Sequence, residues 1–75
     1  MAKDEMTPLR CRIILAVANN GMRVSRAAKE IHMDNSTLLY HLRWIKLITG
    51  KDPKNFYDLI DLVRMAREML TDVYY

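Results

Sequence analysis

Basic and amide-bearing side chains lie close together in the stretch between residues 23 and 43. Arg26 and Lys29 are three residues apart, which places them on one side of a helix, and Asn35 and Arg43 follow in a second helical stretch. Arginine and lysine bind phosphates through their charge, and asparagine and arginine can form paired hydrogen bonds with adenine and guanine. The residues that we expect to contact nucleic acid are Arg23, Ser25, Arg26, Lys29, Asn35, Ser36, Thr37, Leu39, Tyr40, His41 and Arg43.

Several of these residues have a second interpretation. Arg26 and Lys29 can be ordinary solubilising charges on an exposed helix face. The Tyr40 hydroxyl can donate to a phosphate, or its ring can lie half-buried between two helices. His41 could sense pH near neutrality, but we expect a phosphate or base contact. His32 lies in the turn between the two helices, and we expect its role there to be conformational.

The chemistry of enzymes and metal sites finds no support in the sequence. It has no glycine-rich phosphate loop, no paired carboxylates in an apolar pocket and no nucleophile beside a base. Cys11, His32 and His41 lack the spacing of metal ligands. Cys11 is the only cysteine, and we expect it to fill the core rather than to be a reactive thiol. We therefore expect no catalysis, no metal or cofactor and no small-molecule ligand.

The periodicity of apolar residues predicts an all-α fold, a small four-helix domain that contains a helix-turn-helix. We expect Ser25 to cap the second helix and Asp34 or Asn35 to cap the third. Thr7 before Pro8 marks the first helix start. The expected helices span about residues 8–19, 25–31, 35–49 and 55–71, with a loose N-terminus at 1–6, a single domain at 7–75 and the motif at 24–50.

Two short apolar faces meet across the turn of this motif. The first contains Ala28 at the point where the helices cross closely, and Met33 can fill the space beneath the turn. Such a unit holds its second helix outward, into the major groove of DNA. The two faces consist of Val24, Ala27, Ala28 and Ile31 on the first helix and of Leu38, Leu42, Ile45 and Thr49 on the second.

A longer pattern covers about two thirds of the chain, from Asn20 to about Met69. Its residues are Gly21, Ser25, Ala28, Ile31, His32, Met33, Ser36, Thr37, Leu38, Tyr40, His41, Leu42, Ile45, Thr49 and Gly50, followed by Lys51, Asp52 and Pro53. The pattern resembles the C-terminal helix-turn-helix domain of the purine-catabolism regulator (PucR) and sugar-diacid regulator family, in the Fis-type group. The resemblance implies a sequence-specific, double-stranded DNA-binding regulator of transcription.

The chain departs from the family pattern at two positions. The family has Asn where this chain has Ser36 and Arg where it has His41, so the family's DNA contacts are not carried over to those positions. The family also carries this domain at the end of a long sensory regulator, whereas this chain opens with Met1. We expect either a free-standing small protein or an excised domain.

The C-terminal helix is apolar on more of its surface than one core requires. We expect Phe56, Leu59, Ile60, Val63 and Leu70, with Ala66, to cover the core of the chain itself. A second apolar set has no obvious cover and is expected to form a homodimer interface: Trp44, Leu47, Leu62, Met65, Met69 and Val73. The alternative is that the methionines pack under the first helix. The tail from residue 73 is expected either to fray or to join the interface.

Charge and composition agree with a nucleic-acid partner. The net charge is +3, but residues 6–51 carry eight basic and two acidic side chains, which leaves +6 on the motif and the helix before it. No membrane span or signal peptide is apparent, so we expect a cytoplasmic protein. The competing hypothesis is a protein-interaction module that uses the last helix and Trp44. RNA binding is a third possibility, but the sequence lacks the exposed aromatic platform that single-strand recognition uses.

Overall fold

The computed structural model describes the backbone of residues 6–74 and the side chains of residues 6–71. It contains four helices: α1 (Pro8–Asn19), α2 (Val24–Glu30), α3 (Asn35–Thr49) and α4 (Phe56–Tyr74). No strand occurs in the described part of the chain, which confirms the all-α prediction. The bounds of α1 and α3 are as predicted, α2 begins and ends one residue earlier, and α4 begins one residue later and ends three residues later.

The start and end of α1 follow the capping residues in the sequence. The Thr7 hydroxyl accepts the backbone N–H of Arg10 at 3.2 Å. At the other end, the N–H of Met22 bonds to the carbonyl of Val17 at 2.8 Å while Gly21 has a left-handed φ of 62°. This arrangement closes the helix and turns the chain toward α2. Met6 packs against the core, so the predicted loose N-terminus is wrong at this residue, and residues 1–5 lie outside the described range.

Two predicted caps of the helix-turn-helix are not observed. The N-cap of α2 is Arg23, which makes no side-chain capping bond, and Ser25 lies inside the helix. Asp34 occupies the N-cap position of α3 as predicted, but its side chain accepts no capping hydrogen bond. Tertiary packing of the apolar faces therefore holds these two helices in place more than their caps do.

The turns after α2 and α3 use left-handed residues. His32 has a φ of 55°, and the N–H of Met33 bonds to the carbonyl of Ala28 at 2.8 Å, so α2 ends as α1 does. This geometry confirms the conformational role predicted for His32. Gly50, with a φ of 73°, ends α3.

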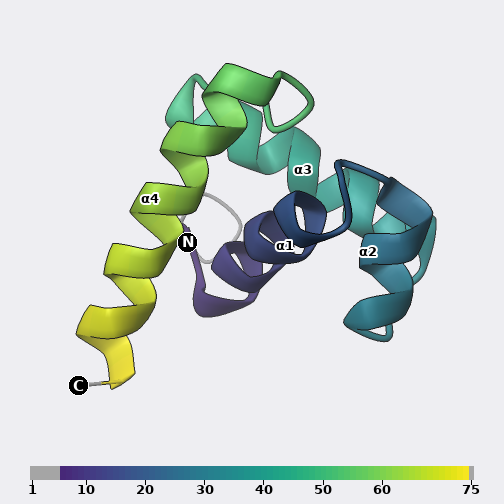
Figure 1. Ribbon diagram of the computed structural model, residues 1–75, viewed down its shortest axis with the longest axis horizontal. Helices are drawn as coiled ribbons and strands as arrows, with labels where there is room; N and C mark the ends of the chain where they lie inside the picture. The colour runs from purple at the N-terminus through teal and green to yellow at the C-terminus, as the bar shows by residue number, and fades with distance from the viewer. Residues whose placement is uncertain (1–5, 75) are drawn as a thin grey trace.

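The four helices are arranged around α1. In Figure 1, α1 lies in the middle, α4 and α2 lie on opposite sides of it, and α3 runs behind it from the side of α2 to the start of α4. α1 packs against each of the other helices, and α2 also packs against α3. The core contains Cys11, Ile13, Ile14, Ala16, Val17, Ala27, Ala28, Leu38, Leu42, Ile45, Leu59, Leu62 and Ala66.

The face of α4 that meets the core differs from the prediction. Leu62 is completely buried beside Leu59 and Ala66, whereas Phe56 is 58% exposed and Ile60 is 44% exposed. The core face is therefore rotated from the predicted one. Apolar residues occupy much of the circumference of this helix, so the helical period alone did not select the face.

Candidate nucleic-acid interface

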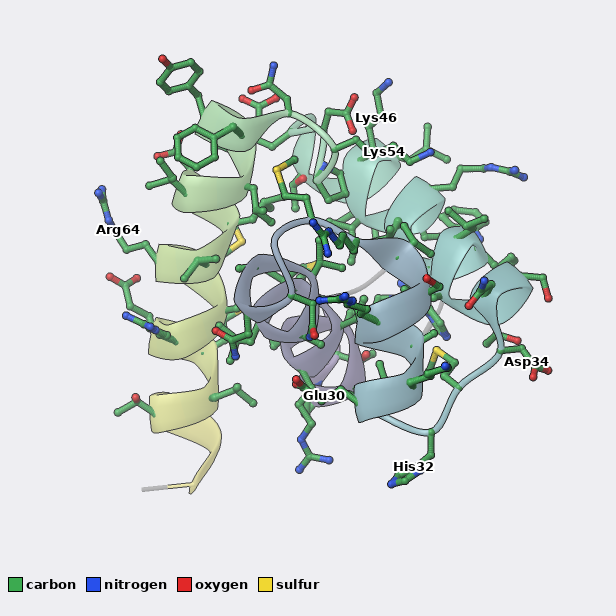
Figure 2. All side chains as sticks on the ribbon, turned by 45° about the vertical axis from the view of Figure 1, so that its right-hand side comes forward. Glu30, His32, Asp34, Lys46, Lys54 and Arg64 are labelled. Atoms are coloured by element: carbon green, nitrogen blue, oxygen red, sulfur yellow. The ribbon has the colours of Figure 1, made fainter. Side chains whose placement is uncertain are left out.

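The α2–α3 unit has the packing that a helix-turn-helix requires. Ala27 and Ala28 are buried where α2 meets its neighbours, and their small side chains permit a close approach. Met33, in the turn, packs against the core as predicted. Leu38, Leu42 and Ile45 form the buried side of α3, which leaves its opposite side at the surface. Figure 2 shows His32 and Asp34 on the turn that joins the two helices.

Most of the predicted contact residues lie on the surface of this unit. Leu39 is the only aliphatic residue among them, and it is 37% exposed. Within residues 6–74, Arg23, Arg26, Lys29 and Arg43 form no ion pair in the structure. The exposed residues are Arg23, Ser25, Arg26 and Lys29 around α2 and Asn35, Ser36, Thr37, Leu39, Tyr40 and Arg43 on α3.

Tyr40 lies on α3 with about half of its surface exposed. Its side chain is 46% exposed, and its ring makes edge contacts with the rings of His41 at 5.5 Å and Trp44 at 6.4 Å. An exposure of 46% agrees with a ring that is about half buried, and the phosphate contact of the hydroxyl stays a prediction. Aromatic neighbours restrict the ring while they leave it at the surface.

His41 differs from the other predicted contact residues because it is half-buried and hydrogen-bonded within the protein. Its Nδ1 accepts a hydrogen bond of 3.2 Å from Nε of Arg10. Burial and the positive charge of Arg10 both lower the pKa of His41. The ring is thus held neutral, and a contact with DNA stays a prediction for Nε2 alone.

Arg10 does not belong to the basic surface, although its charge contributed to the sequence argument. Its side chain is only 3% exposed and lies against α3. A buried arginine cannot neutralise a phosphate on the outside of the protein. Without it, residues 6–51 still carry seven basic and two acidic side chains, so the segregation of charge remains.

Two basic residues that the sequence reasoning missed lie beside the outward face of α3. Lys46, on α3, and Lys54, in the linker to α4, border a hollow of about 240 Å³ together with Leu39 and Arg43. The spacing of Arg43 and Lys46 along one helix was a signal for the first residue. No sequence signal brings Lys54 to this place, because its position depends on the path of the linker.

The predicted dimer interface does not form one surface. Leu62 is completely buried, and Met69 packs against the core with its sulfur 3.9 Å from the sulfur of Cys11. These two predictions are wrong, and the alternative that a methionine packs under α1 holds for Met69. Trp44 and Leu47 lie on α3, which does not pack against α4 within the described residues. The side chain of Val73 lies outside the described ones.

The exposed apolar residues of α4 lie on another side of the helix. Phe56, Tyr57 and Ile60 are exposed by 58%, 77% and 44% respectively. Phe56 and Ile60 border an apolar groove of about 340 Å³, which also contacts Ala18 and Met22 at the end of α1. Apolar patches of this kind often mark an interaction surface.

Cys11 is buried in the core, as the filler interpretation predicted. Burial raises the pKa of the Cys11 thiol, which opposes formation of the reactive thiolate. Among the described residues, no group of three metal-binding side chains lies together. None of the described helices is long and apolar enough to cross a membrane.

Comparison with known proteins agrees with this geometry. The family model described as the PucR C-terminal helix-turn-helix domain matches residues 11–66, about three quarters of the chain. The match contains all of α2 and α3, most of α1 and the first part of α4. It confirms the resemblance seen in the sequence and begins nine residues earlier than Asn20. No curated protein and no solved structure matches the chain significantly.

Proposed function

The chain belongs to the family of PucR C-terminal helix-turn-helix domains, and on that premise we propose that it binds double-stranded DNA and regulates transcription. In this proposal α3 enters the major groove, and the cations around α2 contact the backbone. Asn35 and Arg43 read base edges, and Leu39 packs against a thymine methyl group. We also propose that it acts in the cytoplasm.

One observation carries this proposal: the outward side of the α2–α3 unit presents exposed basic and amide side chains, and the basic ones form no ion pair within the described residues. Arg26, Lys29 and Arg43 are exposed, and none forms an ion pair within the described residues. The buried side of α3 is apolar, so the helix can rotate little without exposing its core residues. A fixed helix with polar side chains outward suits groove recognition.

Salt dependence of binding tests the DNA proposal. The probes are random duplex DNA and a pool selected on the protein, at about 50 and about 200 mM salt. With about six phosphate contacts, affinity is expected to fall by about 10³ between the two salts. The Arg43→Ala variant should lose preference for the selected sequences. A folded protein that binds neither probe at low salt would contradict the proposal and favour a protein partner at the apolar edge of α4.

We further propose a homodimer formed by the exposed edge of α4. Phe56, Ile60, Val63 and Arg67 follow one another at spacings of four, three and four residues, which is the period of a helix-packing seam. In an antiparallel pairing, Ile60 meets the partner's Val63, and the Phe56 ring meets the guanidinium of the partner's Arg67. The partner helix would also fill the groove beside α1. This seam replaces the predicted interface, of which Leu62 lies in the core and Met69 packs against it.

A dimer of this kind suits DNA with two-fold symmetry. Recognition helices that read two half-sites lie about 34 Å apart. The protein measures 29 × 25 × 22 Å, so two copies in contact are large enough to hold their recognition helices this far apart. In Figure 1, α4 and α2 lie on opposite sides of α1, which keeps the proposed seam away from the first helix of the motif.

Sedimentation equilibrium tests the dimer. The wild-type protein is expected to dimerise with rising concentration, and Ile60→Asp should make it monomeric. The matched control is Leu47→Asp, which places the same charge on an exposed leucine of α3. If Leu47→Asp separates the subunits and Ile60→Asp does not, the interface lies on α3. A wild-type protein that stays monomeric at high concentration would refute the dimer.

A further inference from the structure

We propose that the hollow bordered by Lys46 and Lys54 is a binding site for a phosphate of the DNA backbone. This inference rests on the proposed DNA binding and extends its surface past the residues that the sequence indicated. The hollow lies between α3 and the linker at residues 50–55, and it has a volume of about 240 Å³.

The charges around the hollow favour an anion. Arg43, Lys46 and Lys54 contribute three positive charges and Asp52 one negative charge, which leaves +2. Figure 2 shows Lys46 and Lys54 at the same end of the molecule, although one comes from α3 and the other from the linker. Cations that approach from two elements can surround a phosphate oxygen from more than one side, as a single helix face cannot.

The bottom and the rim of the hollow are fixed by the fold. Pro53 is completely buried, and Leu42 is 3% exposed, so the apolar bottom is anchored in the core. The backbone N–H of Lys54 donates to Oδ1 of Asp52 at 2.9 Å, and the N–H of Asp52 donates to Oδ2 of Asp58 at 3.0 Å. These bonds hold the linker in one conformation. Lys54 is thus kept close to α3 before any ligand binds.

Asp52 keeps Lys46 at the site without binding it strongly. Nζ of Lys46 lies 3.7 Å from Oδ2 of Asp52, and the Lys46 side chain is 61% exposed. Ion pairs at such exposed positions contribute little to stability. A phosphate that arrives at the hollow can therefore take over Lys46 at small cost.

The position of the hollow favours a phosphate that belongs to DNA over a small free anion. Leu39 and Arg43 line the hollow, and both also belong to the exposed side of α3 that we propose enters the groove. A DNA strand along that side would continue over Lys46 and Lys54. Further contacts along the strand would supply the affinity that a shallow, solvent-exposed site lacks for a single ion.

The test compares three substitutions that each remove one positive charge: Lys46→Gln, Lys54→Gln and, as control, Arg64→Gln. Arg64 is exposed on α4 and points away from the hollow in Figure 2. Binding of each variant to one selected duplex and to random duplex DNA is measured from about 50 to about 200 mM salt. Far-ultraviolet circular dichroism confirms that each variant is folded.

Each lysine substitution is expected to lower the slope of log affinity against log salt by about 0.9. The fall in affinity between the two salts then becomes about three- to fourfold smaller. The loss should be equal for selected and random DNA, because a phosphate contact carries no sequence information. The control should keep the wild-type slope. If wild type binds with the expected salt dependence and both lysine variants match it, the hollow is no phosphate site while the proposed function stands. If wild type binds no DNA, both proposals fail.

Discussion

Nε of Arg10, on α1, donates a hydrogen bond of 3.2 Å to Nδ1 of His41, on α3. Arg10 is 3% exposed and His41 is half-buried, so the pair joins the two helices inside the protein. The acceptor must be a neutral imidazole, because a protonated ring has no lone pair at Nδ1. Burial and the Arg10 charge lower the pKa of His41, in agreement with this bond.

The lowered pKa of His41 predicts that the domain loses stability in mild acid. In the unfolded chain His41 takes up a proton near its usual pKa of 6.5, whereas in the folded chain it does so at lower pH. The unfolded state therefore binds more protons as the pH falls below about 6.5, and the free energy of unfolding decreases. This contribution is complete above that pH. Urea denaturation at about pH 7.5 and about pH 5.5 measures the change.

Two histidine substitutions distinguish this cause from a general acid effect. Asn at position 41 offers an acceptor without a titration in this range, so His41→Asn should flatten the pH dependence. His32→Asn is the matched control: it removes a histidine that is exposed in the turn, and Asn tolerates the left-handed conformation there. An equal loss of stability on acidification in wild type and His41→Asn would show that another group is responsible.

Replacing His32 with glycine should stabilise the domain. His32 has a φ of 55°, a conformation that costs a side chain about 1 kcal/mol and costs glycine almost nothing. We expect His32→Gly to raise the free energy of unfolding by about 0.5–1 kcal/mol, measured by urea denaturation. Gly50→Ala is the converse control: it introduces a side chain at a φ of 73° and should lower the free energy by a similar amount. A destabilised His32→Gly protein would mean that the ring itself holds the turn.

Because α4 buries Leu62 and leaves Phe56 exposed, we expect substitutions at these two residues to change the free energy of unfolding by different amounts. Leu62 is completely buried and Phe56 is 58% exposed. Leu62→Ala should therefore lower the free energy of unfolding by about 2–5 kcal/mol because it leaves a cavity. Phe56→Ala should cost less than about 1 kcal/mol in the monomer. Urea denaturation at low protein concentration provides the comparison. The opposite order would restore the predicted face of α4, in which Phe56 covers the core.

The sequence was informative where local interactions decide the structure. Thr7 caps the start of α1 as predicted, and the left-handed Gly50 directly follows Thr49, the predicted last residue of α3. The buried positions Leu38, Leu42 and Ile45 follow from helical spacing, and they also determine which side of α3 is exposed. For this reason the predicted contact residues, except His41, are at the surface.

Long-range packing accounts for what the sequence did not indicate. The burial of Arg10 depends on His41, which is 31 residues away in the chain. Lys54 reaches the surface of α3 because Pro53 is buried and Asp52 shapes the linker. The side of α4 that packs on the core depends on how the same linker orients this helix against α1. The periodicity within a single helix does not predict such contacts between distant parts of the chain.

From the weak ion pair between Lys46 and Asp52 we predict that removal of the Asp52 charge strengthens DNA binding. Asp52→Asn keeps an oxygen to accept the N–H of Lys54, so the linker should retain its shape. It also releases Lys46, whose Nζ lies 3.7 Å from the carboxylate. Affinity should rise several-fold at about 50 mM salt and less at about 200 mM, because ions screen exposed charges. Asp61→Asn is the matched control, since Asp61, on α4, pairs with Lys51 of the linker at 3.1 Å and does not line the hollow. Equal gains in the two variants would indicate an effect of net charge, and no gain in either would contradict the prediction that the Asp52 carboxylate opposes a phosphate in the hollow.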